Sequence, residues 1–152
     1  MRVGVISDTH GLLRPAAIKA LQGAQYILHA GDVGDPAILD ALRAIAPVTA
    51  IRGNIDEGGP NQHLPTAELV ELGGHNIYML HDVMKLDLNP DAAGISAVVF
   101  GHSHQPLIEW RRSVLFLNSG SAGPRRFKLP VTIAWMHIEA ASLSARIVDL
   151  DI

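Results

Sequence analysis

Side chains that bind metal ions recur along this chain, each directly after a short apolar segment. We call them the ligand set: Asp8, His10, Asp32, Asn54, His81, His102 and His104. Mixed carboxylate, amide and imidazole ligands suit Mn, Fe, Co, Ni or Zn better than Ca or Mg. A tetrahedral ion takes four ligands, so the ligand set is too large for one such ion and suits two ions that share a carboxylate. Two divalent ions about 3.5–4 Å apart can clamp a phosphoryl group and lower the pKa of a water between them.

The spacing within two motifs predicts how their side chains converge. Asp8 and His10 lie two positions apart, as do His102 and His104. Residues i and i+2 of an extended segment point to the same side. Each pair is therefore predicted to direct both side chains into one cavity.

Each motif also has a simpler structural interpretation. The turn with Asp8 and His10 could only cap the following helix, and Asn54 could only form a turn. His81 competes as a ligand with His75, which the pattern assigns to a solvated hairpin turn. Taken singly these alternatives stay open, and metal binding is favoured because the motifs occur together.

Other polar residues are interpreted structurally. Asp35 is better placed than Asp32 to cap the helix that begins near Pro36. His29 lies inside an apolar segment and is predicted to be buried and hydrogen-bonded behind the ligands. His137 is predicted to be structural, and His63 has no assigned role.

The ligand set needs elements that bring the segment ends together. Apolar runs predict strands at 2–7, 26–30 and 47–52, and helices at 15–21 and 36–45 follow the first two. This alternation predicts βαβ units and a parallel sheet, with sites at the carboxyl ends of its strands.

The second half of the chain changes in style. Gly73 and Gly74 separate the arms of a predicted hairpin, and a loop with a short helix is expected over 82–94. The predicted strands are 67–72, 75–80, 96–100, 107–110, 114–117, 131–138 and 142–148. A mostly parallel first half and an antiparallel second half predict an α/β protein with two sheets packed face to face and helices outside.

Composition narrows the class of protein. The 152 residues suggest one domain spanning 1–152, large enough to fold without staples. The chain has no cysteine, which excludes disulfides and thiolate metal sites. Its net charge of −3 does not favour electrostatic binding to nucleic acid. The sequence has neither a signal peptide nor a membrane-length apolar run, so a cytoplasmic protein without a membrane partner is expected.

The motifs in this order resemble the calcineurin-like metallophosphoesterase superfamily. The stretches ISDTHG, HAGDV, RGNID and FGHSHQP resemble its small prokaryotic single-domain branch. The stretch LNSGSAGPRR is similar to that branch's Asn-Pro-Gly-Ser segment, with Ser119 where proline is usual. The resemblance implies a four-layer α/β/β/α sandwich of two mixed sheets flanked by helices. It further implies a phosphodiesterase in which a bridging hydroxide attacks phosphorus.

The resemblance also assigns roles within the ligand set. It implies a first metal held by Asp8, His10 and His104, a second held by Asn54, His81 and His102, and Asp32 bridging the two. Asp32, Asn54 and His102 would then be the catalytic residues. The implied cofactors are two divalent transition-metal ions, Mn first, with Ni, Fe, Co or Zn as alternatives.

The chain departs from the family pattern beside two ligands. Many relatives carry a histidine where Ile55 stands, and that histidine can protonate the leaving group. Its absence favours good leaving groups or diesters, because general-acid help contributes about 10²–10⁴-fold. Asp56 is a candidate substitute, although a carboxylate beside two cations tends to stay ionised. Asp82 and Val83 stand where relatives often have Gly and His.

Residues outside the ligand set could contact substrate. Arg125 and Arg126 follow a flexible segment and could bind phosphate, or could form a solvated basic loop. Arg14 is open to the same two interpretations. Asn118 is expected, from the resemblance alone, to hydrogen-bond around the site.

Two function classes compete. The first is a phosphodiesterase that acts on a small phosphoester. The second is a non-catalytic, metal-binding scaffold on the same fold, like a subunit of the retromer complex; the complete ligand set favours the enzyme. The net charge of −3 does not favour a third function, a nuclease, because nucleic-acid binding usually needs a basic surface. Edge strands could pair two chains into a homo-oligomer, but the sequence does not show which edges are free.

Overall fold

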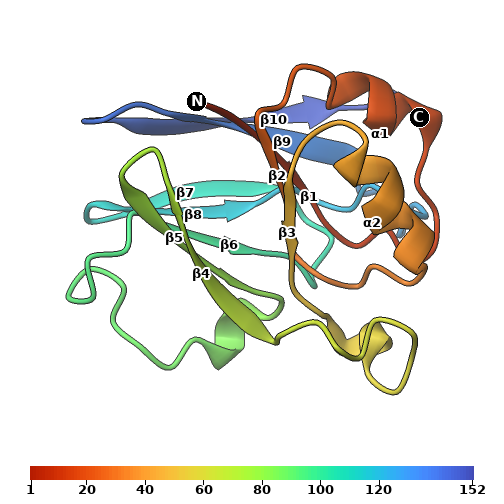
Figure 1. Cartoon of the computed structure of the whole chain (residues 1–152), viewed down its shortest axis with the longest axis horizontal. Helices are drawn as coiled ribbons and strands as arrows, with labels where there is room; N and C mark the ends of the chain where they lie inside the picture. The colour runs from red at the N-terminus through yellow and green to blue at the C-terminus, as the bar shows by residue number, and fades with distance from the viewer.

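Two five-stranded sheets form the protein in a computed structural model that describes residues 1–152 (Figure 1). The strands are β1 (Arg2–Ile6), β2 (Tyr26–His29), β3 (Val48–Ala50), β4 (Ala67–Leu72), β5 (His75–Leu80), β6 (Ala97–Phe100), β7 (Leu107–Arg111), β8 (Val114–Asn118), β9 (Thr132–Ile138) and β10 (Leu143–Asp149). Every strand predicted from the sequence is present, with shifts of one or two residues at the ends. None of the helices has the length and apolar composition needed to span a membrane.

The first sheet has the order β10-β9-β1-β2-β3. Strands β1, β2 and β3 are parallel, while β9 runs antiparallel to both β1 and β10. The helices α1 (Pro15–Ala20) and α2 (Pro36–Arg43) begin with proline, which suits a first helical turn because its missing N–H needs no partner there. Asp35 caps α2 by accepting a hydrogen bond from Ala37 N at 2.9 Å, as predicted.

Both helices cover the outer face of the first sheet. Leu21 beside α1 and Leu42 on α2 are fully buried, in one cluster with Ile27 of β2 and Ile133 of β9. Burial of each such side chain contributes about 1.5–3 kcal/mol. This layer fixes β1 and β2 against the helices that follow them, and so fixes the turns that carry Asp8 and Asp32.

The second sheet has the order β4-β5-β6-β8-β7. Its centre is parallel, because β6 pairs in parallel with β5 and with β8, and antiparallel hairpins close both edges. Its outer face carries a smaller buried cluster that includes Val98, Phe100 and Phe116. The connection from β5 to β6 covers this cluster with the 3-10 turn η2 (Val83–Lys85) and the residues up to Ile95. The outer layer on this side is therefore loop and one short turn.

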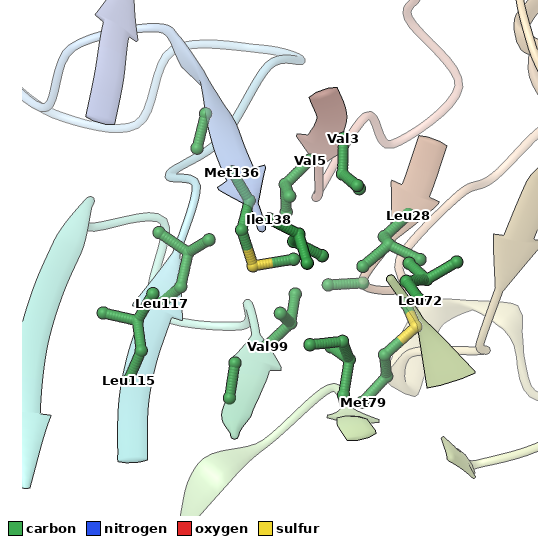
Figure 2. Close-up of a cluster of buried hydrophobic side chains, with 14 of the residues drawn as sticks. Val3, Val5, Leu28, Leu72, Met79, Val99, Leu115, Leu117, Met136 and Ile138 are labelled. Atoms are coloured by element: carbon green, nitrogen blue, oxygen red, sulfur yellow. The ribbon is translucent and has the colours of Figure 1, made fainter. Parts of the chain in front are cut away.

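The main core lies between the sheets. Figure 2 shows Met136 of β9 and Leu117 of β8 directed at Val99 of β6, and Leu28 of β2 beside Leu72 of β4. Alternate residues of β5, β6, β8 and β9 supply most of this core, because successive side chains of a strand point to opposite faces. The predicted α/β sandwich of two mixed sheets is thus confirmed.

The parallel strands of both sheets set the position of the polar turns. The ligand set follows β1, β2 and β3 of the first sheet and β5 and β6 of the second. Asn118 is the last residue of β8, a further parallel strand. The carboxyl ends of these strands meet at one end of the sandwich, where open α/β sheets form their sites.

Candidate metal centre

The carboxylate of Asp8 lies at the centre of three imidazoles. Its Oδ1 atom is 3.4 Å from His104 Nε2, 3.6 Å from His10 Nε2 and 3.7 Å from His81 Nε2. Asp8 is fully buried, and both His81 and His104 are nearly so. Asp8, His10 and His104 form one group of donor atoms that lie within 4.8 Å of one another.

Asp32 lies between two of the same imidazoles. Its Oδ2 atom is 3.3 Å from His10 Nε2 and 3.2 Å from His81 Nε2. Asp8, Asp32 and His81 form a second group of donor atoms within 4.8 Å of one another. Asp8 is therefore common to both groups. Asp32 Oδ2 likewise lies between two histidines, His10 and His81.

Asn54 and His102 complete the arrangement on the side of His81. Asn54 Oδ1 is 3.2 Å from His102 Nδ1, and the rings of His81 and His102 lie edge to face with centroids 5.3 Å apart. Both Asn54 and His102 are exposed to solvent. The structure thus brings the whole ligand set to one place, with a buried side at Asp8 and an open side at Asn54.

Several of these buried polar atoms have no hydrogen-bond partner. They are Asp8 Oδ1, His10 Nε2, His81 Nε2, His104 Nδ1 and His104 Nε2. The ring nitrogens are close to the carboxylates but are not aligned for hydrogen bonding. A buried polar atom without a partner costs about 1–3 kcal/mol, so a cluster of them calls for an explanation. Shared divalent cations would satisfy these atoms together, and the nitrogen and oxygen donors fit transition metals.

The electrostatics of the cluster also demand positive charge. Asp32 and Asp8 raise the pKa of His10 to about 9. Burial lowers the pKa of His81, but the Asp32 and Asp8 carboxylates outweigh it and raise that pKa overall. Burial opposes ionisation of Asp32, yet His10 and His81 hold its pKa far below the usual range. Protons on imidazole compensate the carboxylates here, and a metal ion would displace those protons on binding.

The backbone at most of these ligands is left-handed. The φ angles are 55° at Asp8, 48° at His10, 57° at Asp32, 72° at His102 and 64° at His104. Such conformations are uncommon outside glycine and cost about 1–3 kcal/mol each. The predicted extended geometry of the two i, i+2 pairs is therefore wrong. Tight turns with positive φ aim the side chains inward, and the sequence pattern did not reveal this.

Glycines in front of two ligands allow close approach of the loops. A Cβ on Gly53 would lie 2.1 Å from Asp32 Oδ1, and one on Gly101 would lie 2.1 Å from Ser7 Oγ and 2.6 Å from Asp8 Oδ2. Neither glycine needs an unusual φ, so the requirement is for space alone. The missing side chain at Gly53 and at Gly101 lets each loop backbone contact a carboxylate of a different loop, that of Asp32 and that of Asp8 respectively.

Hydrogen bonds engage one side-chain atom of Asp8, Asp32 and His81 and leave another atom of each directed at the cluster. Asp8 Oδ2 accepts bonds from Ser7 Oγ at 2.7 Å and from His102 N at 3.2 Å, which leaves Oδ1 directed at the imidazoles. Asp32 Oδ1 accepts a bond from Ile55 N at 3.0 Å. His81 Nδ1 donates to the carbonyl of Ala30 at 2.7 Å, so Nε2 is the atom that would present a lone pair once a metal ion displaces its proton.

His29 connects the turns of the first two motifs. Its Nδ1 accepts a bond from Gly31 N at 3.1 Å, so Nε2 carries the proton and donates to Thr9 Oγ1 at 3.0 Å. Thr9 Oγ1 in turn donates to the carbonyl of Val33 at 2.9 Å. Burial lowers the pKa of His29 to about 4, which keeps the ring neutral. The prediction that His29 is buried and hydrogen-bonded is confirmed. The hydrogen bonds of Ser7 and Thr9 around the site were not predicted, because the only sequence signal for these residues is their position beside Asp8.

Asn118 braces the loop that carries His102 and His104. Its Nδ2 donates to the carbonyl of Gly101 at 3.0 Å and to Ser103 Oγ at 3.1 Å, and its Oδ1 accepts from Gly120 N at 2.9 Å. This side chain is fully buried. The expected hydrogen bonding of Asn118 around the site is thus present, and it acts on the loop backbone.

The arginines differ in their positions. Arg14 Nε donates to the carbonyl of Gly123 at 3.2 Å, and Arg125 donates to the backbone oxygen of Ile152 at the carboxyl end. Arg126 is close enough that its charge adds to burial in lowering the pKa of His104. Arg126 therefore lies near the cluster, and Arg125 binds the chain end; a phosphate contact by either arginine stays a prediction.

Two further expectations need correction. Asp56 is buried and accepts hydrogen bonds from Val33 N, Gly34 N and Gly53 N at 2.9–3.1 Å. Both its oxygens are occupied, so it cannot replace the missing general acid. His75 is not a solvated turn residue but begins β5, where it contacts Ser96 Oγ and the Glu139 carbonyl, both at 2.8 Å.

This chain is similar to known proteins along most of its length. Residues 1–141 match the calcineurin-like phosphoesterase superfamily domain. A probable metallophosphoesterase of Methanocaldococcus jannaschii is 36% identical over 134 residues, which are 80% of this chain and 68% of that protein.

Solved structures share the fold at low sequence identity. Vacuolar protein sorting 29 from Cryptosporidium parvum superposes with a TM-score of 0.83 at 21% identity, covering 97% of this chain and 90% of that one. A structure described as a novel archaeal phosphodiesterase gives a TM-score of 0.80 at 20% identity, covering 97% and 100% of the two chains.

Proposed function

We propose that this chain, which belongs to the calcineurin-like phosphoesterase superfamily, is a phosphodiesterase that uses two metal ions. Membership makes it a metal-dependent phosphoesterase. The number of ions and the preference for diesters are our proposal. The observation that carries it is the cluster of buried, unpartnered donor atoms on Asp8, His10, His81 and His104.

The ligand set divides between two ions. Asp8, His10 and His104 would hold the first ion, on the buried side, and Asn54, His81 and His102 the second, on the open side. Asp32 would be shared, since its Oδ2 lies 3.3 Å from His10 Nε2 and 3.2 Å from His81 Nε2. We propose Mn²⁺ as the ion, with Ni²⁺, Fe²⁺, Co²⁺ and Zn²⁺ compatible with the same donors.

Two such ions, when bound, would polarise the phosphoryl oxygens of a substrate and lower the pKa of a water, which would make hydroxide available as the nucleophile. The protein's own part is to hold the ligands at fixed positions before substrate arrives. Ser7, Ile55 N and Ala30 O orient Asp8, Asp32 and His81 respectively. Preorganisation of this kind means that little reorganisation is needed during the reaction.

Esters with acidic leaving groups suit this site better than alkyl esters. Ile55 follows Asn54 and cannot donate a proton, and Asp56 is held by three backbone amides. An alkoxide would therefore leave without a proton from either residue. Substrates with acidic leaving groups need that help least.

The test is hydrolysis of bis-p-nitrophenyl phosphate by chelator-treated protein, with and without Mn²⁺, Ni²⁺ or Zn²⁺. We expect added metal to restore turnover and Asp32→Asn to lower kcat/KM by at least about 100-fold. Asp40→Asn is the matched control, because Asp40 is exposed on α2 and pairs only with Arg43. Bound metal without turnover of any diester would support the scaffold instead.

A further inference from the structure

A cavity of about 360 Å³ opens beside the candidate metal centre. It reaches Asn54, His81 and His102 but not His10 or His104, so it lies on the open side. Its other walls come from the segment after β3, from β5 and from the residues around η2. A group seated in this cavity would extend away from the Asn54 side of the cluster.

We propose that this cavity binds the retained alcohol of a phosphodiester, and that it takes an uncharged, nucleoside-sized group. The proposal rests on the phosphodiesterase function proposed above. It adds the class of substrate: a nucleoside monophosphate ester whose base and sugar lie in the cavity while the phosphate lies against the ligand set.

The size of the cavity limits the group. Small-molecule sites span about 300–1,000 Å³, and 360 Å³ lies at the lower end of that range. One base with its sugar is the scale of group that such a volume admits. A longer nucleic acid chain would have to run over the surface, where the net charge of −3 gives it no support.

The charges of the walls favour an uncharged group. Arg52 and Lys85 are cationic, while Glu57, Asp82 and Asp87 are acidic. Arg52 is already engaged, because its Nη1 donates to the carbonyl of Gln62 at 2.7 Å. The walls therefore carry more negative than positive charge, and a second phosphate on the group would be repelled.

The aromatic wall of the cavity suits a heterocycle. Tyr78 is half-buried on the cavity wall beside Leu80 and Ala67. An aromatic side chain on a cavity wall can stack against a base.

The test keeps one leaving group and varies the other ester. The metal-loaded protein is given p-nitrophenyl esters of methyl phosphate, of thymidine 5′-phosphate and of thymidine 3′,5′-bisphosphate, with p-nitrophenol on the 5′-phosphate. We expect kcat/KM for the thymidine ester to exceed that for the methyl ester at least tenfold. The extra 3′-phosphate should remove most of that gain.

Cavity variants then locate the effect. Tyr78→Ala should lower the thymidine-to-methyl ratio of kcat/KM towards one, and Tyr78→Phe should keep it, because only the ring is needed. Asp87→Lys should raise the relative rate on the 3′-phosphorylated ester. Trp110→Ala, on the far edge strand β7, is the matched aromatic control and should leave the ratio unchanged.

The outcomes separate this inference from the proposed function. Turnover of the methyl ester with no preference for thymidine would overturn the inference while the phosphodiesterase stands. A preference that Tyr78→Ala leaves intact would also overturn it. Failure to hydrolyse any of the three esters or bis-p-nitrophenyl phosphate would refute the proposed function itself.

Discussion

Gly101→Ala tests whether the loops need close approach to hold the metal ligands. The added Cβ would lie 2.1 Å from Ser7 Oγ and 2.6 Å from Asp8 Oδ2, whereas Cβ atoms essentially never approach closer than 3.0 Å. The loop or the carboxylate must therefore move by nearly 1 Å. That movement would disturb the Ser7 Oγ bond of 2.7 Å and the His102 N bond of 3.2 Å to Asp8.

The size of the effect follows from this overlap. Overpacking of a well-packed region costs about 1–3 kcal/mol, and loss of the contacts that orient a ligand lowers metal affinity about 10–100-fold. We expect Gly101→Ala to stay folded, with a metal affinity lower by that factor. Gly59→Ala is the control, because its nearest neighbour, the Asp56 carbonyl, is 3.6 Å away.

The assay is calorimetric titration of chelator-treated protein with Mn²⁺, beside thermal unfolding of the same samples. Folded Gly101→Ala that binds Mn²⁺ within twofold of the original protein would refute the close-approach reasoning. An equal loss in Gly59→Ala would also refute it, since that site has room for a methyl group.

Three further predictions use other parts of the structure. Ile55→His should raise kcat/KM on alkyl monoesters about 10–100-fold by supplying a general acid, and no change would show that the position does not reach the leaving group. The pKa of His29 is about 4 in the folded protein, against 6.5 for the free side chain. The unfolded chain therefore takes up a proton on His29 first as the pH falls, and the free energy of unfolding should decline from pH 6.5 to pH 4 by about 3 kcal/mol. Urea unfolding of the metal-free protein should show that decline and His29→Gln should lack it; parallel curves for the two would contradict it. Removal of metal should lower the free energy of unfolding by about 2.7 kcal/mol relative to protein at 100 times the Kd of the metal, and an unchanged Tm after chelation would count against a bound ion.

The fold was predictable because hydrophobic pattern and turn residues agree along the chain. The β-branched runs and the prolines at 15 and 36 locate β1, α1 and α2. The expected antiparallel second half of the chain is wrong, because β6 pairs in parallel with both β5 and β8 at the centre of the second sheet. The pattern showed short strands there but not the order in which they pair. The thin outer layer over that sheet likewise depends on how the residues around η2 pack, which a pattern does not encode.

The sequence predicted which side chains lie together, but not the backbone geometry that brings them there. The motif order identified the ligand set, yet the left-handed backbone at Asp8 and His102 contradicts the expected extended pairs. The roles of Asp56 and His75 were mistaken because their partners, Gly53 N and the Glu139 carbonyl among them, depend on tertiary contacts. The cavity lined by Arg52 could not be predicted for the same reason, because its walls come from segments far apart in the sequence.

The most direct test counts the bound metal ions and measures whether their electron spins are coupled. Metal-free protein is dialysed against Mn²⁺, its metal content is measured, and its electron paramagnetic resonance spectrum is recorded. Two Mn²⁺ per chain with an exchange-coupled spectrum, replaced by an isolated-ion signal in Asp32→Asn, is the predicted result. One Mn²⁺ per chain, or two ions without coupling in the original protein, would contradict a shared two-metal centre.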